Sequence, residues 1–282
     1  MTPRPAELLV PGALAGQVAL VTGGGTGIGR ATAIDLAALG AAVVVTGRRS
    51  EPLDEVRDLI VGAGGRCLAV PADLREDDQV VGVVDRALAS YGAVDILVNN
   101  AGGQFLAPAE DITPGGWRAV HRVSVDAVWS MTREVATRSM IPNRRGVLFF
   151  LAFSPRRGIS GMVHASAARA AVENLAAGLA LEWSRYGIRS LCIAPGTIAT
   201  DAVIDGYPAD AVESWTRGVP LGRLGRPDEV SGLMCALASP LGSYVTGTTI
   251  TVDGGVDAWG SGEPAPLLVV EPVETPATRE ET

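Results

Sequence analysis

The sequence contains no lysine, so all 23 of its basic side chains are arginines. An arginine stays protonated at working pH, whereas a lysine can shift its pKa and relay protons. We therefore expect no step of this protein's chemistry to use a lysine. The 31 acidic residues outnumber the basic ones and give a formal net charge of -8, which argues against nucleic-acid binding. The partners that we expect are small molecules and further copies of the chain.

Cysteine is also scarce. Cys67, Cys192 and Cys235 lie in apolar contexts without the spacing of metal ligands, so we expect no zinc site and a reducing compartment. The first residues carry no signal-peptide core, and no apolar run is long enough to span a bilayer. These absences predict a cytoplasmic protein with no metal and no membrane partner.

Apolar residues make up 47% of the chain and gather in short, β-branched runs separated by stretches of helical length. A run without alternation suits a strand that is buried on both faces, and such strands with helices between them form parallel sheets. We predict an α/β fold of one domain, a doubly wound (Rossmann) sheet of seven parallel strands. The runs are Val18–Thr22, Ala42–Thr46, Cys67–Val70, Val94–Val98, Val147–Ala152, Ser190–Ala194 and Thr248–Val252.

The two ends of the chain differ in composition from this domain. Residues 1–16 form a lead-in rich in proline and glycine, and residues 261–282 form a tail rich in proline and glutamate, with little to bury. The predicted domain therefore covers residues 17–260.

Glycines follow the first apolar run directly. A strand that turns through glycines into a helix places backbone N–H groups and the positive end of the helix dipole against an anion such as a pyrophosphate. A tight turn without a ligand would show the same glycines. The candidate cofactor-binding residues of this turn are Thr22, Gly23, Gly25, Thr26, Gly27, Ile28 and Gly29.

No carboxylate stands at the end of the second run, where one would hold a ribose diol. Arg48 follows that run instead and is placed to pair with a 2′-phosphate, which favours NADP(H) over NAD(H). A solvated turn is the alternative interpretation of Arg48 and Arg49.

Polar and small residues also follow the third and fourth runs. Asp73, followed by Leu74, can accept a hydrogen bond from an adenine amine. Asn100, Ala101 and Gly102 can hold neighbouring strands beside a cofactor. Turn formation would explain either group alone, but their order along the chain supports the nucleotide site.

With these motifs the chain resembles the short-chain dehydrogenase/reductase family over about Gln17–Gly255. The resemblance implies that the segment beginning Pro195-Gly196 contacts the cofactor, with Ile198 and Thr200 at the nicotinamide carboxamide and the phosphates. Residues 99–110 and 163–170 are similar to the branch that contains peroxisomal trans-2-enoyl-CoA reductase and 2,4-dienoyl-CoA reductase.

The family usually relays protons through an Asn, a Ser, a Tyr and a Lys, and this chain matches none of them. The corresponding positions hold Ser124, Ala152, Ala165 and Arg169. An alanine at the Tyr position removes the positioned acid. Arg169 keeps a positive charge and can grip the nicotinamide ribose hydroxyls, but it relays protons poorly.

Few residues can substitute for the lost relay. Tyr207 lies where the family places its mobile substrate lid, and His164 is next to the vacant Tyr position; either can equally be a packing residue. Ser154 and Ser166 can donate hydrogen bonds, but no base to activate them is visible in the sequence. The catalytic candidates are Arg169, Ser124, Tyr207 and His164.

Reduction of an enoyl thioester tolerates these losses better than reduction of a ketone does. Hydride goes to the β carbon while charge develops on the thioester oxygen, which simple hydrogen-bond donors can stabilise. We predict an NADPH-dependent reductase of an α,β-unsaturated acyl thioester or a similar activated alkene. A non-redox NADP(H)-binding pseudoenzyme or repurposed fold, and a carbonyl or alcohol dehydrogenase with non-standard residues, are the alternatives. The helix expected over 161–186 and the family resemblance favour a homotetramer or homodimer.

Overall fold

The structure is a computed structural model that describes residues 4–154 and 158–259. The proline- and glutamate-rich tail expected over 261–282 lies outside the described residues. No described helix is long and apolar enough to cross a membrane.

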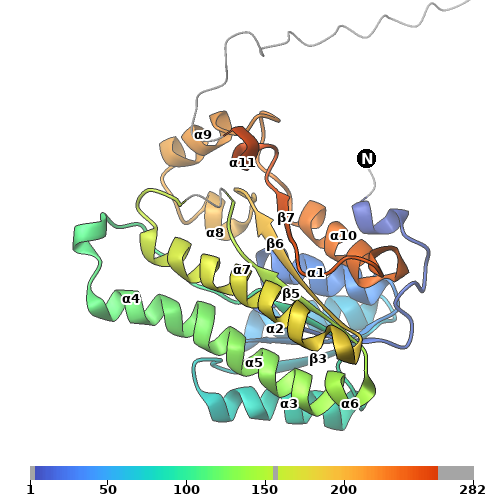
Figure 1. The fold of residues 1–282 in the computed structure, drawn as a ribbon. Coiled ribbons are helices and arrows are strands. Elements are labelled where there is room, and N and C mark those ends of the chain that lie inside the picture. Colours follow the sequence, from blue (N-terminus) through green and yellow to red (C-terminus); the bar gives the residue numbers. More distant parts are fainter. Residues whose placement is uncertain (1–3, 155–157, 260–282) are drawn as a thin grey trace, which may run out of the picture.

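Seven parallel strands form one sheet in the order β3-β2-β1-β4-β5-β6-β7 (Figure 1). This confirms the predicted doubly wound sheet. The strand order reverses between β1 and β4, and ligands of such sheets bind at the carboxyl ends beside that reversal. The strands are β1 Val18–Thr22, β2 Ala42–Gly47, β3 Arg66–Pro71, β4 Ile96–Asn99, β5 Gly146–Leu151, β6 Ile188–Pro195 and β7 Thr249–Val252.

The fourth strand begins two residues later than the apolar run predicted. Val94 is buried, but its backbone N–H donates to Ser139 Oγ at 2.8 Å, and its carbonyl accepts from the same hydroxyl at 3.0 Å. A side chain thus satisfies both backbone groups. Apolarity alone predicted burial here correctly but not membership of the sheet.

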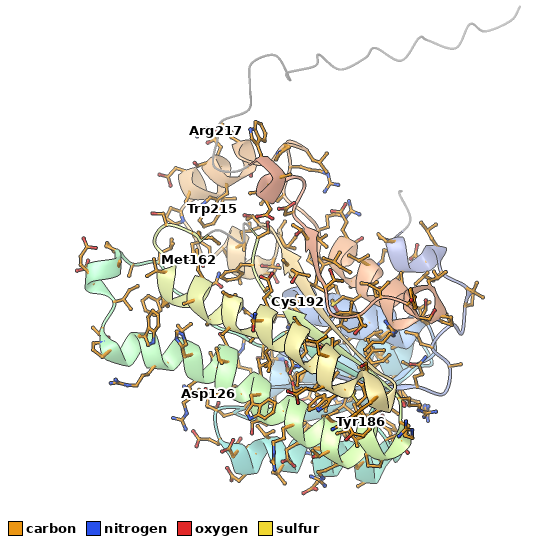
Figure 2. All side chains as sticks on the ribbon, in the orientation of Figure 1. Asp126, Met162, Tyr186, Cys192, Trp215 and Arg217 are labelled. Carbon is orange, nitrogen blue, oxygen red and sulfur yellow. The ribbon has the colours of Figure 1, made fainter. Side chains whose placement is uncertain are left out.

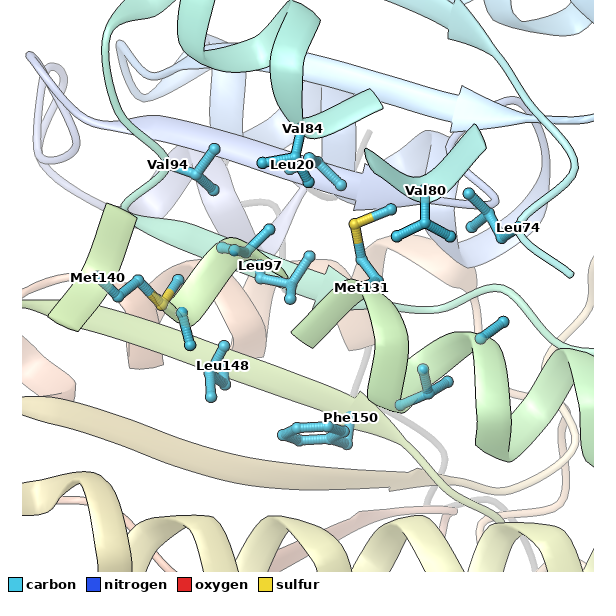
Figure 3. Packing of buried hydrophobic residues seen from close by; sticks show 14 of the residues in the cluster. Leu20, Leu74, Val80, Val84, Val94, Leu97, Met131, Met140, Leu148 and Phe150 are labelled. Atoms are coloured by element: carbon cyan, nitrogen blue, oxygen red, sulfur yellow. The ribbon is translucent and has the colours of Figure 1, made fainter. Parts of the chain in front are cut away.

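Helices cover both faces of the sheet. One face packs on α3 (Asp77–Tyr91), α5 (Ala127–Val135) and α7 (Val163–Trp183), and the other on α1 (Gly27–Ala38), α2 (Ser50–Gly62) and α10 (Pro227–Ala238). Figure 3 shows the first face, where strand residues such as Leu97 and Leu148 meet Met131 and Val84 from the helices. The shorter helices are α4 Pro114–His121, α6 Ile141–Asn143, α8 Asp201–Ile204, α9 Ala209–Arg217 and α11 Val256–Trp259.

The lead-in is fixed to the domain from Arg4 onward. A short 3-10 helix, η1 (Pro5–Leu8), packs on α10, and Arg4 forms an ion pair of 2.6 Å with the buried Asp35 of α1. Ser231 of α10 also hydrogen-bonds to Asp35. Burial raises the pKa of this carboxyl, while Ser231 and Arg4 oppose the rise. The lead-in therefore shields a polar link between α1 and α10.

Gly232 allows this contact, because a Cβ there would lie 2.5 Å from Cβ of Pro5 and 3.2 Å from N of Ala6. We expect Gly232→Ala to lower the free energy of unfolding by about 1–3 kcal/mol through overpacking, although alanine is the better helix former. Gly178→Ala is the matched control, since a Cβ at that exposed position in α7 meets nothing within 4 Å. That change should raise the free energy by about 0.5–1 kcal/mol. Urea denaturation measures both, and an equal gain in the two variants would contradict the close contact.

Candidate functional site

A cavity of about 280 Å³ lies at the carboxyl ends of β1, β2 and β3. It joins the glycine turn after β1 to the residues that follow the next strands, as the sequence predicted. Its lining includes Gly23, Gly25, Thr26, Arg48, Asp73, Leu74, Ala101 and Gly102.

The turn between β1 and α1 depends on glycine at particular positions. Gly23 and Gly27 have φ angles of 63° and 53°, in the left-handed region that favours glycine. A Cβ on Gly29 would lie 2.2 Å from the carbonyl oxygen of Gly23. Larger residues would close the cradle in which α1 begins.

Hydrogen bonds tie this turn to the end of β4. Thr22 Oγ1 accepts from the backbone N–H groups of Asn100 and Ala101, each at 3.0 Å. Asn100 Nδ2 donates to the carbonyl oxygens of Thr22 at 2.9 Å and Gly23 at 3.2 Å. Thr22 and Asn100 therefore fix the cradle. The sequence predicted this role, holding neighbouring strands together, for Asn100.

The cavity contains one engaged carboxylate and a cation without an ion-pair partner. Arg75 binds Asp73 through Nε at 2.9 Å and lowers the pKa of this carboxyl to about 2, so Asp73 is ionised and its charge is balanced. Arg48 has no ion-pair partner among the described residues. The glycine cradle, the helix N-terminus and the available Arg48 fit a dinucleotide that carries an extra phosphate.

A second cavity, of about 470 Å³, opens at the carboxyl ends of β5 and β6. We call residues 201–220, which contain α8 and α9, the lid; Val203, Tyr207 and Trp215 from it line this cavity. Figure 2 shows Trp215 of the lid above Met162, which precedes α7, at the same end of the molecule. The predicted cofactor residues Ile28, Asn100, Pro195, Gly196, Ile198 and Thr200 also line it.

Arg169 is the one charged side chain among the described residues that line this second cavity. It is 8% exposed, its Nη1 donates to the carbonyl of Leu151 at 2.6 Å, and its guanidinium carbon lies 5.2 Å from the ring centre of Phe153. A Cβ on Gly102 would lie 2.0 Å from Nη2, so Arg169 reaches the first cavity across this glycine. Burial lowers the pKa of Arg169 to about 10, which leaves it cationic at neutral pH.

Ser154 has a carboxylate partner, so the expectation that no base accompanies it was wrong. Its hydroxyl lies in the lining of the second cavity and donates to Oδ2 of Asp253, just after β7. Ser166, by contrast, accepts from the backbone N–H of Ile159 at 3.2 Å. In the sequence Asp253 directly follows the last apolar run, but only the sheet order brings β7 beside the end of β6.

Tyr207 lies over the second cavity. Its hydroxyl accepts a hydrogen bond of 3.3 Å from Nε2 of Gln104, and its ring meets Trp215 edge-on with centroids 5.0 Å apart. It also packs against a buried cluster that includes Ala165, the vacant Tyr position. The lid thus places a phenol at the second cavity, on a segment other than α7.

Ser124 and His164 lie outside the lining of both cavities. Ser124 is buried in a π-helical segment, Arg122–Asp126, and its Oγ accepts from the N–H of Gly103 at 3.4 Å. His164 is fully buried, and its ring lies tilted against Phe105 with ring centres 4.2 Å apart. Neither of its ring nitrogens has a hydrogen-bond partner among the described residues. Both residues are candidates by their position along the chain, which does not reveal the direction of a side chain.

Burial lowers the pKa of His164 below its ordinary value of 6.5. Below that pH the unfolded chain takes up a proton at His164 more readily than the folded protein does, so the stability present above pH 6.5 is lost as pH falls through the folded pKa. We expect His164→Leu to unfold with a smaller loss of stability between about pH 7 and pH 5 than the wild type. Urea denaturation across that range measures it, and parallel curves would contradict the buried neutral imidazole.

The described part of the chain contains no group of three or more His, Cys, Asp or Glu side chains that could hold a metal ion. Cys67, Cys192 and Cys235 form no disulfide among the described residues.

Comparison with known proteins gives consistent matches over most of the chain. Residues 23–257 match the family described as Enoyl-(Acyl carrier protein) reductase. A probable 2,4-dienoyl-CoA reductase of Bacillus subtilis is 37% identical over 85% of this chain and 96% of its own. Cis-4-hydroxycyclohexanecarboxylate dehydrogenase of Sinomonas cyclohexanicum is 38% identical over 87% and 98%. The crystal structure of a gluconate 5-dehydrogenase from Burkholderia cenocepacia, in complex with NADP and tartrate, has a TM-score of 0.81 at 34% identity and covers 87% of this chain and 96% of its own.

Proposed function

The chain belongs to the short-chain dehydrogenase/reductase family, and from that premise we propose an NADPH-dependent reductase that acts on the double bond of an α,β-unsaturated acyl thioester or a similar activated alkene. One observation carries the proposal. Ala152, at the Ser position of the relay, lines the cavity beside Arg169, and Ala165, at the Tyr position, lies in the buried cluster that packs with Met162 and Tyr207. The hydroxyl groups of Ser154 and Tyr207 line the cavity from other segments.

The residues of the first cavity suit NADP(H), which also occupies the gluconate 5-dehydrogenase structure. The glycine turn and the N-terminus of α1 would hold the pyrophosphate, and Arg48 the 2′-phosphate. Arg169 would bind the ribose hydroxyls at the boundary of the two cavities. When bound, NADPH supplies the hydride that the β carbon accepts.

The side chains of the second cavity match the two other needs of the reaction. As the β carbon is reduced, negative charge moves to the thioester oxygen, where the Tyr207 hydroxyl can donate a hydrogen bond and the Arg169 cation adds attraction at low dielectric. The α carbon then needs a proton. The Ser154 hydroxyl, which lines the cavity, can give its proton to the α carbon and take one back from solvent.

Carbonyl reduction fits this arrangement less well. The carbon that accepts hydride then bears the oxygen that needs the proton, so the acid must stand at the position that Ala165 occupies. Alkene reduction separates the hydride acceptor from the proton acceptor by one carbon. Alkene reduction can therefore use proton donors that are placed elsewhere in the cavity.

An alcohol dehydrogenase is the second candidate, because Ser154 and Asp253 can also accept a proton from an alcohol and the Sinomonas relative is a dehydrogenase. A protein that binds NADP(H) without redox chemistry is the third, because none of the four usual relay residues is present. The three candidates differ in what consumes or produces NADPH.

The test is NADPH absorbance over a panel of enoyl-CoA and dienoyl-CoA thioesters, free enones and ketones, with NADP+ and secondary alcohols for the reverse direction. Thioester-dependent oxidation of NADPH is the expected result. Turnover of alcohols alone would establish the dehydrogenase instead, and tight NADP(H) binding with no turnover would establish the non-redox protein.

Ser154→Ala should lower kcat for alkene reduction by about 10²-fold or more, because the hydroxyl that gives the α carbon its proton is lost. NADPH affinity should stay unchanged, which fluorescence titration measures. Ser214→Ala is the matched control, since Ser214 lines the same cavity from α9. Equal kcat losses in the two variants would count against this role of Ser154.

Arg48→Gln should weaken NADPH binding by about tenfold to a hundredfold and leave NADH binding little changed, since only NADPH carries the phosphate. Arg49→Gln, which also removes a cation from the first cavity, is the control. Calorimetric titration with both cofactors measures the effect. An unchanged ratio of the two affinities would remove Arg48 from the proposal.

A further inference from the structure

In the structure the hydrogen bond between Gln104 and Tyr207 runs from the amide to the phenol. An amide nitrogen can only donate, so the phenolic oxygen of Tyr207 is the acceptor at 3.3 Å from Nε2. The Tyr207 O–H is therefore not used in this bond. No acceptor for it occurs among the described residues, and Tyr207 lines the second cavity.

Gln104 sits on a segment whose next residues are anchored. The ring of Phe105, the next residue, lies tilted against the buried His164 and comes so close to α4 that a Cβ on Gly116 would lie 3.0 Å from it. The backbone N–H of Ala107 donates to the carbonyl of Gly161 at 3.0 Å. These contacts fix the loop that follows β4 and so define where the Gln104 amide can reach.

Tyr207 is held from the other side by the lid and the cavity wall. Its ring meets Trp215 edge-on and packs on the cluster that contains Met162 and Ala165. The ring can keep these contacts whichever way its hydroxyl hydrogen points. The direction of that hydrogen depends on the polar partner.

We propose that Gln104 is a positioning residue, which holds the Tyr207 hydroxyl as a hydrogen-bond donor toward a carbonyl oxygen of the substrate. The proposal rests on the reductase function and deepens it, because it makes the carbonyl group the feature that the lid recognises. The substrate class is then an alkene conjugated to a carbonyl group, and an isolated alkene is excluded.

Gln104→Glu is the sharpest test, because an exposed carboxylate accepts and would take the Tyr207 hydrogen for itself. We expect it to lower kcat by about 10²-fold, as Tyr207→Phe does, without changing NADPH affinity. Gln104→Met, which has a similar length and no polar atoms, should cost only about tenfold because the O–H stays free. Steady-state kinetics on the best alkene of the panel gives both values.

Gln104→Glu changes both the hydrogen-bonding character and the charge at position 104, and repeating it in Tyr207→Phe separates the two effects. Gln104→Glu should have almost no further effect on kcat there, because no phenol remains to be turned. A kcat close to that of the wild type in Gln104→Glu, or an equal loss in both backgrounds, would overturn the proposal.

Binding gives a measurement that does not need turnover. The protein loaded with NADP+ is titrated in a calorimeter with hexanoyl-CoA and with the hexyl thioether of CoA, which lacks the carbonyl oxygen. Gln104→Glu should weaken binding of the thioester by about tenfold and leave binding of the thioether unchanged. If Gln104→Glu leaves the ratio of the two affinities unchanged, the role of Gln104 alone is overturned. A shifted ratio of affinities in a protein that reduces no alkene would overturn the reductase and keep the role of Gln104. No binding of either ligand would overturn both.

Discussion

The link between β1 and β4 is the interaction on which the rest of the site depends. The sheet order reverses there, and Thr22 spans the reversal by donating to the carbonyl of Val98 at 3.2 Å and accepting from two N–H groups after β4. These bonds satisfy buried polar groups that would otherwise be costly. Because Asn100 then closes over Gly23, one small network sets both the cofactor cradle and the start of the substrate cavity.

The two cavities share a wall that is built from a glycine and a cation. Gly102 belongs to the first cavity and Arg169 to the second, and the guanidinium fills the space that a side chain on the glycine would need. The carbonyl of Leu151 and the ring of Phe153 hold the arginine, which has no neutralising carboxylate in the part of the chain that the structure describes. A buried positive charge of this kind is stabilised when electron density arrives beside it.

The sequence predicted the elements whose residues act locally. Strands buried on both faces appear as apolar runs, and the turn after β1 shows its glycines in order, so the sheet and the cofactor cradle could be recognised. It could not predict pairs that depend on topology. Ser154 and Asp253 are brought together only because β7 pairs with β6. The burial of His164, and the place of the lead-in over α10, likewise depend on packing between distant segments.

In the proposed reductase the groups that take part in catalysis accordingly lie mostly outside α7. The helix α7 keeps its cation but has an alanine where the family has its phenol, and the polar groups near the cavity come from the loop after β4, the end of β5, the lid and the end of β7. Acid and donor are then carried by separate segments, so each can vary without disturbing the cofactor cradle.

The guanidinium at position 169 has one more consequence for the proposed reductase of acyl thioesters. A lysine amine in the same buried place would lose its proton more readily on desolvation, and a neutral amine attacks thioesters. The guanidinium of Arg169 remains protonated and is therefore a poor nucleophile. An acyl thioester held against it is safe from aminolysis, and the enzyme is safe from being acylated by its own substrate.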